Sequence, residues 1–161
     1  VKKEIQKIQE QLPEFSVKKT EKENLHLTLK FLGEVDEEQI EEVKKRLEGI
    51  SFEKFETKID SIGVFSEKFI RIVWLHLINC DKLQKQIDEK LKDLFKPEKR
   101  FMSHLTIARV KSLKDRKIFL ENLKKIKIPK IKFVVDNFRL KESVLTEKGP
   151  VYEDLGVYDL S

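Results

Sequence analysis

The chain contains the words HLTLKF (residues 26–31) and HLTIAR (residues 104–109), which begin with the same three residues. Both words alternate polar and apolar positions, and this alternation predicts a β-strand with its polar side chains on one face. The side chains predicted to share a face are His26 and Thr28 in the first word, and His104 and Thr106 in the second. Because the chain has only three histidines, two of them in one repeated word indicate a repeated structural unit.

The segments around the two words follow the same order. Apolar periodicity predicts helix, strand with HLT, helix, strand and strand in each half of the chain. The predicted segments are residues 1–12, 24–33, 36–50, 52–65 and 69–78, followed by residues 81–95, 102–111, 115–126, 130–146 and 151–160. We therefore predict one domain over residues 1–161, with an internal repeat of about residues 1–80 and 81–161 and approximate two-fold symmetry.

Composition narrows the class of protein. The chain has 161 residues, of which 39% are hydrophobic and 39% charged, and it has no apolar run of the roughly 20 residues that cross a bilayer. With one cysteine, Cys80, and no pattern typical of a signal peptide, we expect a cytoplasmic protein without a membrane anchor. The net charge of +5 suits a phosphate-bearing partner, and the abundance of Lys and Glu is typical of proteins from heat-loving organisms.

The two HLT words suit phosphoryl transfer without a metal. If the halves are related by a two-fold axis, both polar faces can meet across a groove and present two imidazoles and two hydroxyls to one ligand. Imidazoles can serve as base and acid near neutral pH, and hydroxyls can donate to phosphate oxygens as charge develops there. Arg109 would add a cation for the same oxygens.

Two alternatives compete with this interpretation. A catalytic zinc site needs three ligands from His, Cys, Asp or Glu, and neither word has a carboxylate at strand spacing to complete the set. In the other alternative the two histidines are ordinary strand residues without a shared role. Matched threonines at equivalent places of a repeat favour a shared site, whereas the third histidine, His76, has no counterpart and is expected to be structural.

Several stretches of the sequence resemble a known family. NLHLTLKFLGE, VWLHL, HLTIARVK and FRLKESVLTEKGPVYEDL are similar to the two-histidine (H-x-T-x) phosphoesterases, in particular the RNA 2',3'-cyclic phosphodiesterase branch, also called 2'-5' RNA ligase. This resemblance implies a bilobal α+β fold with two antiparallel sheets that face a central groove and with helices outside. It also implies a monomer that needs no cofactor and no metal and acts on RNA or a nucleotide with a 2',3'-cyclic phosphate.

The resemblance also assigns roles. His104 would be the base that activates water, and His26 the acid that protonates the departing 3' oxygen and leaves a 2'-phosphate, although the two roles could be exchanged. Thr28 and Thr106 would bind phosphate oxygens together with Arg109. Phe31 corresponds to an aromatic residue that stacks on a nucleobase, with a place in the core as its alternative. Because Phe31 and Arg109 each lie five residues after their histidine, strict alternation puts both on the opposite face unless a bulge intervenes.

Several expectations stay open at this point. The same two histidines would support reverse ligation through 2'-5' linkages. A binding module of this fold without turnover and a two-histidine ribonuclease that cleaves internal bonds are the rival functions. Relatives begin with a short apolar strand, so we expect native N-terminal residues to precede this chain. Weaker candidates for guiding RNA are Lys30, Arg71, Lys111 and Arg139.

Overall fold

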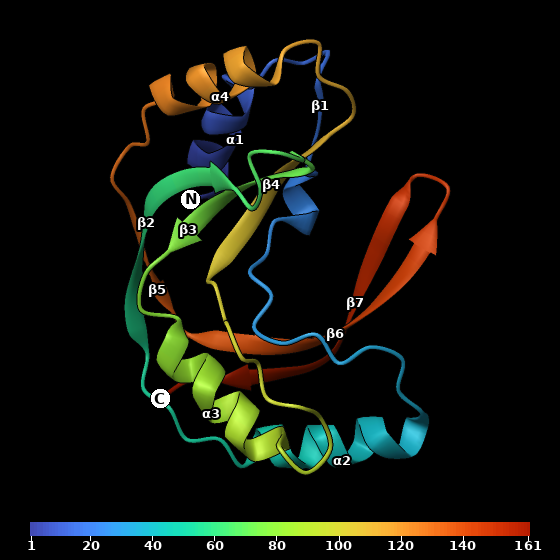
Figure 1. Ribbon diagram of the computed structural model, residues 1–161. Helices are drawn as coiled ribbons and strands as arrows, with labels where there is room; N and C mark the ends of the chain where they lie inside the picture. Colours follow the sequence, from blue (N-terminus) through green and yellow to red (C-terminus); the bar gives the residue numbers. More distant parts are fainter. The chain divides into compact units, whose positions relative to one another are not determined.

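The computed structural model describes residues 1–161 and has a mixed α+β fold (Figure 1). Its helices are α1 (Lys2–Glu10), α2 (Glu37–Glu48), α3 (Asp81–Leu91) and α4 (Arg116–Lys125), with a short 3₁₀ helix η1 (Lys22–Asn24). Its strands are β1 (Val17–Lys19), β2 (Phe55–Val64), β3 (Ile72–Leu77), β4 (His104–Val110), β5 (Ile131–Val135), β6 (Asn137–Thr146) and β7 (Gly149–Asp159). They form a five-stranded sheet in the order β1-β4-β3-β2-β5 and a two-stranded sheet, β6-β7. The predicted α+β class with two sheets is confirmed.

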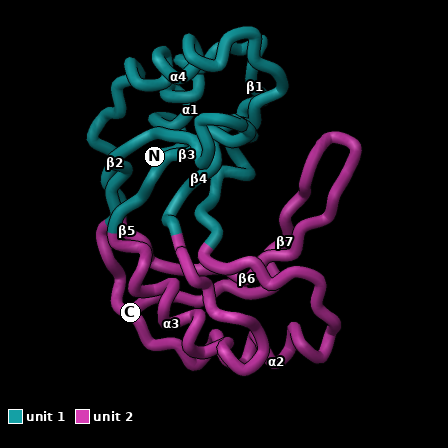
Figure 2. The backbone as a smooth tube through the Cα atoms, viewed as in Figure 1, with its two compact units in different colours: residues 1–28, 57–78, 102–133 teal, residues 29–56, 79–101, 134–161 magenta.

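The backbone divides into two compact units, each assembled from three segments of the chain (Figure 2). Unit 1 comprises residues 1–28, 57–78 and 102–133, and unit 2 comprises residues 29–56, 79–101 and 134–161. Each unit therefore draws on both halves of the chain, and the histidine and threonine of both HLT words belong to unit 1. The repeat with its boundary near residue 80 stays a prediction.

Unit 1 is organised around β3 and β4, whose apolar residues alternate with partly exposed ones. Val73, Leu75 and Ile107 are almost fully buried, and Ile5 and Ile8 of α1 are buried as well. Because these isoleucines recur at helical spacing, α1 has one continuous apolar stripe, as the sequence predicts.

Buried Gln9 ties α1 to the edge of this sheet. Its side-chain amide donates to the carbonyl oxygens of Thr20, at 2.9 Å, and Ile107, at 2.8 Å. The Ile107 oxygen also accepts from the Thr20 backbone amide at 2.9 Å, so the Gln9 side chain adds a second donor where β1 ends.

The predicted strand at residues 24–33 is wrong in its extent. Only Leu27 makes a β-bridge, and it pairs antiparallel with Leu105. The chain pairs with β4 as β1, turns through η1, and returns to β4 at Leu27 alone, so one edge of the sheet is formed by two separate pieces. Alternation of apolar residues marks the face on which Leu27 lies but does not reveal how many residues find a partner.

Unit 2 has its own apolar core between α2, α3 and the β6-β7 sheet. The core consists of Val43, Leu47, Leu83, Ile87, Leu91, Phe138 and Leu160. Helix α2 begins with a capping box, in which Asp36 accepts from the Gln39 backbone amide at 2.8 Å and the Gln39 side chain accepts from the Asp36 amide at 3.2 Å. Because both orphan donors are satisfied, the start of α2 is fixed by its own sequence.

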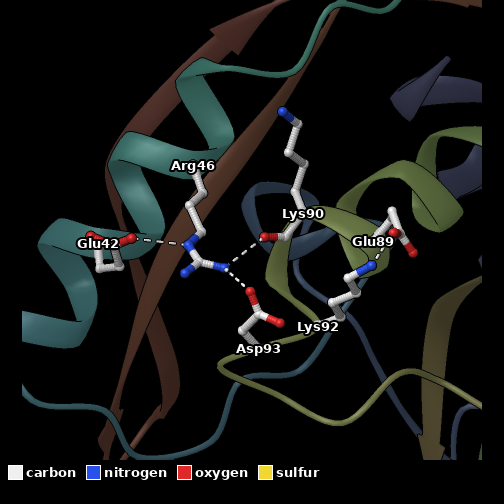
Figure 3. Close-up of polar contacts among 6 residues, drawn as sticks. All are labelled: Glu42, Arg46, Glu89, Lys90, Lys92 and Asp93. Atoms are coloured by element: carbon white, nitrogen blue, oxygen red, sulfur yellow. Dashed lines mark hydrogen bonds and ion pairs between the residues drawn. The ribbon is translucent and has the colours of Figure 1, made fainter.

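Arg46 connects α2 to the C-terminal end of α3 (Figure 3). Its guanidinium donates to Glu42 at 3.0 Å, to the Lys90 carbonyl at 3.1 Å and to Asp93 at 3.5 Å. These contacts raise the pKa of Arg46, chiefly through the Glu42 hydrogen bond, so the guanidinium remains charged under all ordinary conditions.

Lys30 and Asp88 form an almost fully buried ion pair within unit 2. The Lys30 ammonium donates to Asp88 at 2.5 Å and to the Lys96 carbonyl at 2.8 Å, and its side chain is only 3% exposed. The suggestion that Lys30 guides RNA is therefore unsupported. Arg139, a second such candidate, pairs with Asp154 at 2.7 Å.

A second correction concerns residues 130–146, predicted as one strand. They form β5 and β6, which belong to different sheets and are separated at Asp136. The Asp136 carbonyl accepts from the Leu160 amide at 2.8 Å, which continues the register of β6 and β7 one pair beyond Asn137 and Asp159. A continuous β-rich sequence does not show where the chain changes sheets.

None of the helices is long and apolar enough to pass through a membrane.

Candidate active site

The two HLT words lie side by side in unit 1. Leu27 and Leu105, the central residues of the words, pair across an antiparallel bridge. In such a pairing the residues that flank the bridge share its opposite face, so His26 stands across from Thr106, and Thr28 across from His104. Two histidines and two threonines thus meet on one face of the sheet, along β4 and the neighbouring Leu27 segment.

Burial agrees with this assignment of faces. Leu105 is 6% exposed and Ile107 is fully buried. His104 and Thr106, which alternate with them along β4, are half-buried. On the other word His26 is half-buried and Thr28 is exposed. The apolar face of β4 belongs to the core of unit 1, and the polar face is open to a ligand.

Both histidines are anchored in the same way. The Nδ1 atom of His26 is 2.6 Å from the Asn24 carbonyl oxygen, and that of His104 is 2.9 Å from the Met102 carbonyl oxygen. A carbonyl only accepts, so each Nδ1 donates its proton, and in the neutral ring Nε2 is the basic nitrogen. The equivalent anchors, each two residues before the histidine, orient both Nε2 atoms for proton transfer.

A β-bulge brings Arg109 to the same face. Thr106 pairs with Trp74, but the register then shifts, so that Ala108 pairs with Val73 and Arg109 pairs with Ile72. The bulge makes Ile107 and Ala108 consecutive buried residues and returns Arg109 to the face of Thr106. The bulge that Arg109 needs in order to share a face with His104 is therefore present.

Comparison with known proteins identifies the family. The model of the LigT-like phosphoesterases matches residues 1–74 and 79–152, and each range contains one HLT word. This chain belongs to the LigT-like phosphoesterase family.

Two curated relatives of this family are the RNA 2',3'-cyclic phosphodiesterases of Methanocaldococcus jannaschii and Archaeoglobus fulgidus. The first is 40% identical over 95% of this chain and 90% of the relative, and the second is 38% identical over 89% and 84%. The predicted family resemblance is confirmed.

Solved structures confirm the LigT-like fold. TT0787 of Thermus thermophilus superposes with a TM-score of 0.81 at 24% identity and covers 99% of this chain and 91% of that one. E. coli LigT complexed with 3'-AMP superposes with a TM-score of 0.74 at 23% identity, with 96% and 92% covered.

Phe31, the predicted base-stacking residue, belongs to unit 2 rather than to the unit with the histidines. Its side chain is 81% exposed, so the alternative that places Phe31 in the core is wrong. Stacking on a nucleobase stays a prediction for this residue.

His76, which the sequence led us to expect as structural, is a third histidine on the polar face of this LigT-like sheet. His76 on β3 pairs in register with His104 on β4, so the two imidazoles are cross-strand neighbours. The Nδ1 atom of His76 is 2.7 Å from Oδ1 of Asp60, which sits at a bulge in β2. The alternation of residues 72–77 already places His76 and Trp74 on one face, but the alignment with His104 depends on strand register.

One aromatic ring contacts His104 on this face, and a second contacts that ring. The Phe65 ring lies edge-on to the His104 imidazole, with centroids 4.9 Å apart, and 5.8 Å from the Trp74 ring. Phe65 is 55% exposed, and Gly63 on β2 pairs with Trp74 and leaves room for its indole. The Phe65 ring therefore lies against both the His104 imidazole and the Trp74 indole.

Proposed function

We propose that this chain hydrolyses the terminal 2',3'-cyclic phosphate of RNA or of a nucleotide to a 2'-phosphate, with two histidines as acid and base and without a metal. The observation that most directly supports the proposal is the bridge between Leu27 and Leu105, which joins two identically anchored histidines and two threonines on one face. The names of the curated relatives agree with the predicted cyclic phosphodiesterase activity.

The proposed reaction moves one proton at each histidine. His104 takes a proton from water through Nε2 as the water oxygen attacks phosphorus. The bond between phosphorus and the 3' oxygen breaks, and His26 gives its Nε2 proton to that oxygen. The products are a 2'-phosphate and a 3'-hydroxyl, and the two histidines exchange roles if the leaving oxygen lies nearer His104.

The threonines and Arg109 would bind the non-bridging oxygens. Thr28 stands across from His104, and Thr106 across from His26, so each hydroxyl lies beside the histidine of the other word. Hydroxyl and guanidinium donors stabilise the charge that grows on these oxygens during attack. This arrangement assigns stabilisation of the transition state to the chain's own side chains.

A binding module of the same fold is the rival function. It would need the threonines and Arg109 but not two histidines whose Nδ1 atoms are both held by carbonyl oxygens. Hydrolysis of a nucleoside 2',3'-cyclic phosphate in EDTA, with the product isomer identified by chromatography, separates the two functions. We expect the 2'-phosphate alone, whereas binding without turnover by the folded protein would support the module.

We also infer that the protein acts as a monomer in a reducing cytosol and that a 5'-hydroxyl can take the place of water as the nucleophile. Its one cysteine, Cys80, is buried and leaves no thiol exposed for an intermolecular disulfide.

Attack by a 5'-hydroxyl on the cyclic phosphate, with departure of the 3' oxygen, would yield a 2'-5' phosphodiester. Light scattering and incubation of cyclic-ended RNA with 5'-hydroxyl RNA test these inferences.

A further inference from the structure

Two cations face one another directly on the polar face of the sheet, beyond the threonines. Lys18 of β1 pairs in register with Arg109 of β4, and both side chains are exposed. Val17 and Ala108, their neighbours along the strands, are buried on the opposite face, which confirms the direction in which the two cations point. Like charges directly opposite one another on a sheet are destabilising.

Nothing in the structure neutralises this pair. Neither Lys18 nor Arg109 forms an ion pair, although Lys19, the next residue, pairs with Glu14 at 3.6 Å. Elsewhere Arg46 and Arg139 each contact a carboxylate. Unpaired cations held against one another indicate a place where an anion from outside the chain binds.

The segments that carry the pair contain no acid, and a further cation lies beside them. Arg71 lies beside the end of β4, because its carbonyl oxygen accepts from the Val110 amide at 2.8 Å. The Arg71 guanidinium lies over the exposed Phe69 ring, 4.4 Å from the centroid, and forms no ion pair. Residues 15–20 and 103–114 contain no Asp or Glu.

We propose that Lys18, together with Arg109, binds a second phosphate of the substrate, the one attached to the 5' oxygen of the nucleoside that bears the cyclic phosphate. This inference rests on the proposed function, because it places the cyclic phosphate between the two HLT words. Arg109 follows Thr106 along β4 and so stands between the two phosphates, while Lys18 contacts only the second. In RNA this second phosphate is the last internucleotide linkage, so the subsite selects an oligonucleotide over a nucleoside.

The position of Lys18 on an edge strand has a simpler explanation, and the test must distinguish it from phosphate binding. Charged residues on edge strands discourage pairing with other chains. That role would apply to Lys18 and Lys19 alike and would not require a position opposite Arg109. A substrate-binding role distinguishes the two lysines.

The test compares a nucleoside 2',3'-cyclic phosphate with the same compound bearing a 5'-phosphate and with a cyclic-ended dinucleotide. For the unmodified protein we expect a kcat/KM about tenfold higher with either 5'-substituted substrate, as is typical of one charge-assisted contact. Lys18→Ala should abolish most of this preference. It should also reduce the slope of log kcat/KM against log salt by about 0.7 for the substituted substrates.

Lys19→Ala is the matched control, since it removes the same charge one position away and should keep the tenfold preference. If Lys18→Ala leaves the ratio between substrates at its original value, or if Lys19→Ala reduces it equally, the subsite does not exist. Circular dichroism confirms that each variant is folded. Failure of the unmodified protein to hydrolyse any of the three substrates would contradict the proposed function, whereas hydrolysis without a preference contradicts the subsite alone.

Discussion

All three histidines of the chain are anchored through Nδ1, but the acceptors differ. His26 and His104 donate to backbone carbonyl oxygens, whereas His76 faces the Asp60 carboxylate. A carbonyl orients the ring through a hydrogen bond alone, whereas the Asp60 carboxylate also brings a negative charge to its histidine. The neighbouring His76 is therefore distinguished from the proposed acid and base by its partner and not by its place on the sheet.

The variant His76→Asn tests whether this distinction holds. The asparagine amide can still donate to Asp60, and the bell-shaped dependence of kcat/KM on pH should keep both limbs, because the proton transfers are assigned to His26 and His104. The pH profile of the purified variant provides the measurement. Loss of one limb would instead make His76 the acid or the base.

The close approach of β2 and β3 at Gly63 gives a prediction at the scale of elements. A Cβ atom at this position would lie 2.7 Å from Cη2 of Trp74, whose indole also contacts Phe65. We expect Gly63→Ala to displace the indole, to lower the free energy of unfolding by about 1–3 kcal/mol and to reduce turnover. Trp74 is the only tryptophan, so its fluorescence reports the displacement directly.

Gly49→Ala serves as the control for this variant. Gly49 has an ordinary helical φ of −79° at the end of α2, and it belongs to the unit without Trp74. The tryptophan emission spectrum of Gly49→Ala should match that of the unmodified protein. An unchanged spectrum for Gly63→Ala as well would show that the strands adjust without moving the indole.

The buried pair of Lys30 and Asp88 gives a second prediction at this scale. Burial alone would raise the pKa of Asp88, but hydrogen bonds from Lys30, the Glu98 amide and Gln84 outweigh it and hold that pKa below its usual value. A lowered pKa in the folded state stabilises the protein above the unfolded pKa, and this stabilisation is lost as pH falls through the folded pKa. We therefore expect Asp88→Asn to cost about 3 kcal/mol at pH 7 and less below pH 4 or so.

Urea unfolding of Asp88→Asn at several pH values measures this difference. The double variant Lys30→Met with Asp88→Leu is the control, since replacing both partners removes the unpaired charge and should recover much of the loss. A constant difference between pH 7 and pH 3 would contradict the assignment of the effect to the Asp88 carboxylate.

The sequence predicts most elements of this fold because their signals are local. The capping box of Asp36 and Gln39, the stripe of α1 and the alternation of β3 each lie within a few residues of chain. The failures depend on distant segments. The single bridge of Leu27, the register of His76 with His104 and the break at Asp136 are each set by a partner strand far away in the sequence.

At the scale of the molecule, the division into units shows why the site needs tertiary structure. The sequence assigns one HLT word to each half of the chain, yet both pairs of histidine and threonine lie in unit 1. A compact unit consists of segments that pack together, whatever their order in the chain. The repeated words can therefore be recognised from sequence, whereas their direct pairing cannot.

The charge content gives a prediction for the whole molecule. The chain has 34 Lys and Arg and 29 Asp and Glu, and its carboxylates and cations form networks such as that around Arg46. Such networks contribute more at high temperature, because the cost of desolvating charges falls. We predict an unfolding midpoint above the range of about 45–65 °C typical of mesophile domains. A calorimetric midpoint within that range would contradict the predicted thermophilic character.

The most direct test of the central claim is the dependence of kcat/KM on pH in EDTA for the unmodified protein, His26→Ala and His104→Ala. We predict a bell-shaped profile for the unmodified protein and a loss of at least about a hundredfold in each variant, with folding retained, because each histidine transfers one proton. Full activity in either variant, or turnover that EDTA abolishes, would contradict acid–base catalysis by these two residues.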